Sequence, residues 1–145
     1  MSIKENIQEA MKDAMRAKDT IRLECLRMAK GAILVKEKSS GDAVTDEDVV
    51  AVMRTEVKKR QQSIEMFEEH GKMEEADASR QEIVVLESFL PQQLSIEDLE
   101  AKVRAYLADH PDINHAGKLT GAMKKELGDA ADGKMLNEIC RKVLS

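Results

Sequence analysis

Hydrophobic positions recur at helical spacing through most of the chain. Near the N-terminus, Ser2 can cap a predicted helix that runs to about Ala17. Ile3, Ile7, Met11 and Ala14 lie on one face of this helix. After a break at Asp19, a second helix is predicted from about Thr20 to Lys36, with a buried side formed by Cys25, Met28, Ala29, Ala32 and Ile33. We expect these two helices to form an antiparallel hairpin.

Two further helices are predicted before residue 90. The first follows an N-cap at Thr45, carries acids in its first turn and ends at His70-Gly71, where glycine can adopt the left-handed conformation. Its apolar stripe is broken only by Arg60 and consists of Val49, Met53, Val57, Ile64 and Phe67. The next helix, from about Met73 to Phe89, places Ile83, Leu86 and Leu90 on one face.

The strongest break in the pattern is the segment Leu90-Pro91-Gln92-Gln93-Leu94-Ser95. Pro91 has no backbone N–H and disfavours helical dihedrals at the residue before it, so the preceding helix must stop here. Ser95 can cap a new helix that carries acids in its first turn. The pattern therefore predicts an N-terminal helical domain at residues 1–90, a linker at 91–94 and a C-terminal domain at 95–145.

Three shorter helices are predicted after the break. The first runs from about Ile96 to Ala108, and the second is capped by Asn114 and ends near Gly128. The third is capped by Asp132, and its apolar face holds Leu136, Ile139, Cys140 and Val143. With 42% hydrophobic residues, two Phe, one Tyr and no Trp, the composition suits packing between helices. The prediction is an all-α fold, with a four-helix unit followed by a small three-helix unit.

The charge distribution gives no general sign of a polyanion partner. The net charge is −5, with 15 basic and 19 acidic residues up to Leu90, and 8 basic and 9 acidic residues from Pro91 onward. Nucleic-acid binding would therefore need a local basic patch. No apolar run approaches the roughly 20 residues of a membrane span, and the charged N-terminus does not resemble a secretory signal, so we expect a cytoplasmic protein.

Several short motifs occur in a characteristic order. They are Met11-Lys12-Asp13-Ala14-Met15 with Ala17-Lys18-Asp19, Arg22-Leu23 with Leu26-Arg27-Met28, Arg60 through Phe67, Glu82-Ile83 with Leu86, the Leu90–Ser95 segment, Gly117-Lys118 with Gly121, and Ala131-Asp132-Gly133-Lys134. In this order and spacing the chain resembles the YqeY family, small relatives of the C-terminal tail of the GatB subunit of transfer-RNA-dependent amidotransferase. The resemblance implies an all-helical fold, a C-terminal domain similar to the GatB tail, and a link to transfer-RNA-dependent amidation.

Two short segments depart from the family pattern. Asp129 and Ala130 stand where the family usually has glycine followed by a basic residue, which removes one potential phosphate ligand. Ala116 and Thr120 stand where methionines often flank the Gly-Lys pair.

Gly117 and Gly121 are four residues apart and leave one helix face without side chains. This face could pack tightly against a neighbouring helix, or its backbone could approach a nucleic acid. Lysines that could then contact phosphates are Lys118, Lys124, Lys125, Lys134 and Lys142. The GatB tail is thought to meet the body of transfer RNA, so the resemblance favours the second interpretation.

Arg60 places a charge in an apolar stripe, where it must be paired or must reach solvent along its aliphatic stem. We predict an ion pair with Glu82 on the adjoining helix; ligand binding and extension of the side chain to solvent are alternatives. Arg60 also ends a basic run with Arg54, Lys58 and Lys59, followed by Gln61 and Gln62. That run could bind phosphates or form an ordinary solvated face.

Residues for catalysis are not apparent in the sequence. Cys25 and Cys140 lie on predicted apolar faces and are interpreted as buried free thiols. His70, His110 and His115 fall at helix ends or in loops without metal-ligand spacing, and no glycine-rich phosphate loop is present, so we expect no metal and no cofactor.

The leading hypothesis is therefore a helical binding module that recognises transfer RNA, or an RNA-containing complex, through its C-terminal domain. One alternative, implied by the resemblance, is an accessory subunit of a carbon-nitrogen ligase that uses glutamine as amido donor. Another is a protein-interaction adaptor that uses exposed Met and Leu side chains.

Overall fold

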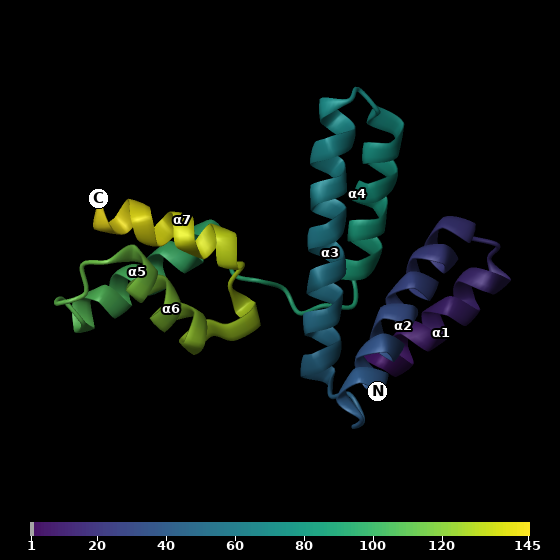
Figure 1. Ribbon diagram of the computed structural model, residues 1–145, viewed down its shortest axis with the longest axis horizontal. Helices are drawn as coiled ribbons and strands as arrows, with labels where there is room; N and C mark the ends of the chain where they lie inside the picture. The colour runs from purple at the N-terminus through teal and green to yellow at the C-terminus, as the bar shows by residue number, and fades with distance from the viewer. Residues whose placement is uncertain (1) are drawn as a thin grey trace. The chain divides into compact units, whose positions relative to one another are not determined.

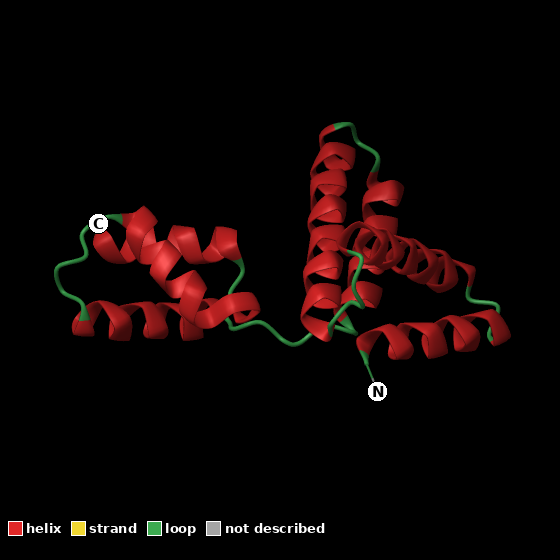
Figure 2. Cartoon of the chain, turned by 60° about the horizontal axis from the view of Figure 1, so that its bottom comes forward, coloured by secondary structure: helices red, strands yellow, loops and turns green. Residues whose placement is uncertain are grey.

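The computed structural model describes residues 2–145, which form seven α-helices and one short 3-10 helix and include no β-strand (Figure 2). The helices are α1 (Ile3–Arg16), α2 (Thr20–Ser40), α3 (Asp46–Glu69), α4 (Met73–Glu87), α5 (Ile96–Asp109), α6 (Ala116–Leu127), η1 (Gly128–Ala130) and α7 (Gly133–Leu144). The predicted all-α fold class is confirmed.

The chain divides into two compact units, Met1–Leu90 and Pro91–Ser145, which we call the N-terminal and C-terminal units. Two residues that the sequence pattern assigns to the linker are bonded within the C-terminal unit. The Gln93 side-chain amide donates to the Asp129 carbonyl at 2.9 Å, and the Leu94 N–H donates to the Ala130 carbonyl at 2.8 Å. These bonds fix the start of the C-terminal unit before α5 begins.

Side-chain caps define most helix starts, as polar residues at these positions predict. The predicted caps at Ser2, Thr45, Ser95 and Asp132 each accept a hydrogen bond from a backbone N–H in the first turn. The cap of α6 was predicted wrongly: His115, not Asn114, accepts from the Gly117 N–H.

Two helix ends also differ from the prediction. Helix α2 continues to Ser40 rather than stopping near Lys36, because the first residue that adopts the left-handed conformation is Gly41, at φ +73°. Helix α4 ends at Glu87 rather than Phe89. By contrast, Gly71 follows α3 with φ +70°, in the left-handed conformation that the sequence predicts.

In the N-terminal unit, α3 and α4 run side by side as an antiparallel pair, and α1 packs along α2 (Figure 1). The core between these helices contains Ile7, Cys25, Leu26, Ala29, Ile33, Val49, Met53, Val57 and Leu86. Met28 was predicted to be buried, but its side chain is 56% exposed. The reason is the orientation of α2, whose buried arc is centred on Leu26, Ala29 and Ile33 and leaves Met28 at its edge.

Arg60 lies inside this unit with only 6% of its surface exposed. Its Nε donates to Glu82 Oε2 at 2.9 Å, and its Nη1 donates to the Glu56 carbonyl oxygen at 3.0 Å and lies 3.5 Å from Glu56 Oε1. Glu56, which the sequence did not suggest as a partner, is also buried and is shared with the ammonium of Lys59 at 3.1 Å. Arg60 therefore connects α3 to α4 through a hydrogen-bonded charge network.

The C-terminal unit has its own apolar core. Leu99 and Val103 of α5 contact residues of α6, α7 and the adjoining loops, namely Ile113, Leu119, Met123, Ala131, Leu136, Ile139 and Cys140. Because this core takes one stripe from each helix, the opposite faces of α6 and α7 are left for solvent.

Limited proteolysis of the full chain is expected to cut between Leu90 and Ser95 before it cuts any helix. Pro91 and Gln92 are exposed and lie outside the helices, so this backbone can enter a protease more easily than helical backbone can. The fragments can be identified by mass spectrometry after brief digestion. Early cleavage within α3, with the 90–95 segment intact, would contradict a boundary at this place.

Replacing Arg60 with alanine is expected to lower the free energy of unfolding by about 3–5 kcal/mol, because it takes the cation away from the buried Glu56 and the half-buried Glu82. The double variant Arg60→Ala, Glu82→Ala should recover part of this loss, but not all, since Glu56 remains buried. Urea denaturation measures the free energy of unfolding of the single and the double variant. Strictly additive losses would show that Arg60 and Glu82 are not energetically coupled.

Arg80→Ala is the matched control for this experiment. Arg80 also bridges α3 and α4, pairing with Glu68 at 3.0 Å and with Asp77 at 2.6 Å, but its side chain is exposed. Its removal should cost no more than about 1 kcal/mol.

Candidate nucleic-acid interface

Charge is distributed unevenly within the C-terminal unit. Residues 91–115, which contain α5, have two basic and five acidic residues, whereas residues 116–145, which contain α6 and α7, have six basic and four acidic residues. The near-neutral total therefore conceals an acidic segment and a basic segment. The basic segment has the charge that a phosphate-binding surface needs.

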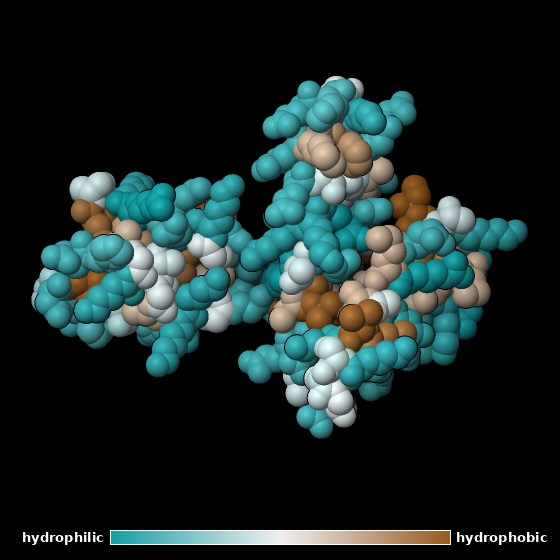
Figure 3. Space-filling view, viewed as in Figure 1, coloured by the Kyte–Doolittle hydropathy of each residue, from teal (hydrophilic) through white to brown (hydrophobic). Residues whose placement is uncertain are grey.

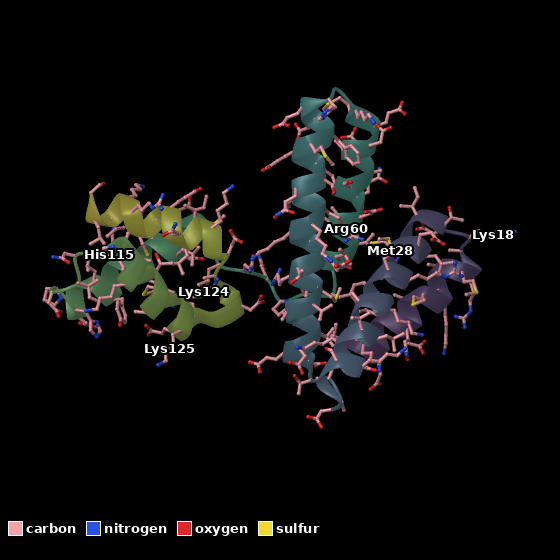
Figure 4. All side chains as sticks on the ribbon, in the orientation of Figure 1. Lys18, Met28, Arg60, His115, Lys124 and Lys125 are labelled. Atoms are coloured by element: carbon pink, nitrogen blue, oxygen red, sulfur yellow. The ribbon has the colours of Figure 1, made fainter. Side chains whose placement is uncertain are left out.

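Four of the five predicted lysines are exposed and available for a partner. Lys118, Lys124 and Lys125 project from α6, and Lys134 from the first turn of α7. None of these four takes part in the ion pairs found among residues 2–145. Figure 4 shows His115 near the start of α6 and Lys124 and Lys125 near its end.

The fifth lysine, Lys142, is engaged within the protein. Its ammonium lies 2.9 Å from Glu100 Oε1, and Arg104 approaches the same oxygen at 3.3 Å. The hydrogen bond from Lys142 holds the pKa of Glu100 below its usual range. Lys142 thus connects α7 to α5, and we do not group it with the four exposed lysines.

The two glycines of α6 have different surroundings. A Cβ atom at Gly121 would meet no heavy atom within 4 Å, so no helix of the C-terminal unit packs tightly there. A Cβ at Gly117 would lie 2.9 Å from His115 Cε1, which belongs to the residue that caps the same helix. Tight packing of a neighbouring helix, one of the two interpretations of this glycine pair, is therefore wrong; at Gly121 the backbone of α6 is open to solvent.

The cap explains the close approach at Gly117. His115 Nδ1 accepts the Gly117 N–H at 3.1 Å, which requires Nδ1 to be unprotonated. The imidazole lies against the Gly117 backbone, where a larger residue would displace it. Sequence inspection placed His115 at a helix end but did not identify this role, because histidine is not among the commonest capping residues.

Two contacts join α6 to the start and middle of α7. A Cβ at Gly133 would lie 2.7 Å from Lys124 Nζ, so the ammonium of Lys124 lies directly over Gly133. Gly133 is the residue before Lys134 in the sequence. Further along, the Thr120 hydroxyl lies 3.3 Å from Asn137 Oδ1 and donates to the Ala116 carbonyl oxygen at 2.8 Å. Because these contacts place α6 beside α7, we group the outward residues of the two helices as the α6–α7 surface: Gly117, Lys118, Gly121, Lys124, Lys125, Lys134 and Asn137.

Arg141 is a basic residue that sequence inspection missed. It is exposed and lies one turn beyond Asn137, on the same face of α7. Its spacing of four from Asn137 and seven from Lys134 was the signal that could have identified it. Arg141 extends the α6–α7 surface toward the end of the chain.

The basic run on α3 is less available for a phosphate ligand. Arg60 is buried and paired, and Lys59 lies 3.1 Å from Glu56 Oε2. Two of its four basic residues are therefore already paired with carboxylates, which leaves the α6–α7 surface as the stronger candidate.

The two cysteines lack the properties of a nucleophile. Both are buried, and burial raises the pKa of the Cys25 and Cys140 thiols, so the reactive thiolate is disfavoured near neutral pH. Within residues 2–145, no three His, Cys, Asp or Glu side chains converge as metal ligands would. In the same part of the chain, every helix is too short or too polar to cross a membrane.

Comparison with known proteins gives a family match over nearly the whole chain. Residues 4–144 match the family described as Yqey-like protein. The chain is also similar to an uncharacterised protein of the fission yeast Schizosaccharomyces pombe, with 30% identity over 89 residues, which cover 61% of this chain and 72% of the yeast protein. A match of this extent shows that the chain belongs to the YqeY family.

Proposed function

We propose that this protein binds structured RNA, with transfer RNA or a transfer-RNA-containing complex as the expected partner, through the α6–α7 surface. The observation that carries the proposal is the group of four exposed lysines around a stretch of open helix backbone at Gly121. Lysines supply phosphate contacts, and a glycine lets a sugar-phosphate backbone approach the helix more closely than any other residue does.

The kind of recognition follows from the shortage of available aromatic rings. Tyr106 is the one tyrosine and is half-buried, and its ring stacks on His110 with centroids 4.1 Å apart. Stacking on splayed bases, which dominates recognition of single-stranded RNA, therefore has little support here. Contacts to phosphates and 2′-hydroxyl groups along a folded RNA suit the surface better.

The charge distribution favours binding through one part of the C-terminal unit. Residues 91–115 have an excess of acids and repel a polyanion, whereas residues 116–145 attract it. Few phosphate contacts are available, so affinity should be modest and dependent on salt. The resemblance of the C-terminal unit to the GatB tail supports transfer RNA as the RNA class.

Reversing Lys118, Lys124 and Lys125 to glutamate in the full chain is expected to abolish binding of transfer RNA, because three phosphate contacts become repulsive. For the unaltered protein, about three contacts give a slope of about −2 to −3 for the logarithm of affinity against the logarithm of salt concentration. Fluorescence anisotropy with labelled transfer RNA at several salt concentrations measures the loss of affinity in the variant and the salt dependence of the unaltered protein. Circular dichroism verifies that the variant is folded.

The control reverses three exposed lysines of the N-terminal unit, Lys18, Lys38 and Lys72, which changes the total charge by the same amount. This control should retain most of the affinity. Equal loss in the two triple variants would show that only total charge matters. Unchanged binding in the α6–α7 variant would overturn the proposal, and glutamine hydrolysis by the purified protein that Cys25→Ser removes would favour the alternative of a ligase subunit.

The substitution Gly121→Ala separates binding from folding. Nothing in the protein opposes a Cβ there, and alanine favours a helix over glycine by about 1 kcal/mol, so the variant should unfold at a higher temperature. If RNA approaches the backbone at Gly121, the same variant should bind transfer RNA several-fold more weakly.

Gly31→Ala is the matched control, since Gly31 is an exposed glycine within α2 and also has open space around its Cβ position. It should stabilise the protein similarly and leave RNA affinity unchanged. Equal RNA affinity in both glycine variants would show that RNA does not approach the backbone at Gly121.

A further inference from the structure

Met28 differs from the other exposed methionines because it contacts a buried cation. Its side chain is 56% exposed, yet its Sδ accepts a hydrogen bond from Arg60 Nη2 at 3.9 Å. Figure 4 shows Met28 on α2 and Arg60 on α3 directed toward one another. A surface sulfur atom is thus connected to the charge network inside the N-terminal unit.

The guanidinium of Arg60 is less well satisfied on this side than on the others. Its Nε and Nη1 donate to oxygen acceptors of Glu82 and Glu56, whereas Nη2 donates to a thioether, which is a weak acceptor. A charged donor gains most from an oxygen acceptor. The contact therefore leaves room for a stronger bond at the position of Met28.

We propose that Met28 is a site of reversible oxidation by hydrogen peroxide, and that Arg60 binds the resulting sulfoxide. In this step a lone pair of Sδ attacks one peroxide oxygen, an S–O bond forms and the O–O bond breaks. The sulfur is oxidised, the peroxide is reduced, and the second oxygen leaves as water. A methionine sulfoxide reductase restores the thioether.

The geometry suits an oxygen atom between the two groups. Sδ and Nη2 are 3.9 Å apart, and an oxygen on the sulfur can lie within about 2.7–3.2 Å of Nη2, the usual range of an N–H···O hydrogen bond. The sulfoxide would replace a weak acceptor with a strong one and connect α2 to α3. Met15, which is equally exposed, has no contact between its sulfur and a charged donor within residues 2–145, and oxidation in a core usually disrupts packing.

Met15 is the matched comparison because it is also 56% exposed and has no hydrogen bond to a charged group among residues 2–145. Two full-length variants test the difference. One carries Met15→Leu, Met66→Leu and Met73→Leu, so that among residues 2–145 Met28 is the remaining strongly exposed methionine. The other carries Met28→Leu, Met66→Leu and Met73→Leu, so that Met15 remains in the same part of the chain. Each is treated with hydrogen peroxide until intact mass shows one added oxygen, and peptide mapping locates it.

Oxidation of Met28 is expected to raise Tm by about 4 °C or more, as one added hydrogen bond to a charged group predicts, and reduction of the sulfoxide should reverse the shift. Oxidation of Met15 should leave Tm unchanged or lower it. An unchanged or lower Tm after oxidation of Met28, or an equal rise with Met15, would overturn the proposal. In an Arg60→Lys background the rise should disappear; if that variant does not fold, the comparison of Met28 with Met15 decides alone.

Discussion

The N-terminal unit is organised around one buried guanidinium. Arg60 lies in an apolar stripe of α3 and has acceptors on α3 itself, on α4 and on α2, through Glu56, Glu82 and Met28. The desolvation of such a group offsets much of its attraction to its partners, so the network does not by itself account for a large net stability. Its effect is on geometry, because a displacement of α4 along α3 would break the bond between the buried Arg60 and Glu82. The apolar residues make the helices pack, and Arg60 restricts how they pack.

The helices of the C-terminal unit pack without a buried charge network. The buried polar or charged residues found among residues 2–145 are Glu56, Arg60 and Ser79, and all three belong to the N-terminal unit. Around an apolar core, the basic residues of α6 and α7 remain on the surface, and one of them, Lys142, also joins α7 to α5. Figure 3 shows that hydrophilic residues cover much of the visible face of this unit. A surface lysine that stabilises nothing inside the protein can bind a phosphate without loss of stability. This separation of fold from charge is what makes the α6–α7 surface suitable for RNA.

The sequence predicted the features that depend on local chemistry. Helical periodicity gave the all-α fold, and Ser2, Thr45, Ser95 and Asp132 were recognisable as caps because their side chains act on residues two or three positions away. The exposure of Met28 and the role of Glu56 were not predicted, since both depend on how α2 and α3 are rotated about their axes. Periodicity indicates that a helix has a buried face but defines the edge of that face only to within one residue. Met28 lies at such an edge.

The charge of the α6–α7 surface also depends on packing that the sequence alone does not reveal. Counting charges in the whole C-terminal unit gave no general sign of a nucleic-acid partner, since acids slightly outnumber bases. The relevant quantity is the charge within about one Debye length of a phosphate, roughly 8 Å at physiological salt, and this depends on which helix each residue occupies. Lys124 is brought over Gly133, the residue before Lys134, only by the packing of α6 against α7. A chain with excess acid can therefore present a basic surface, because burial of one stripe per helix decides which charges become neighbours.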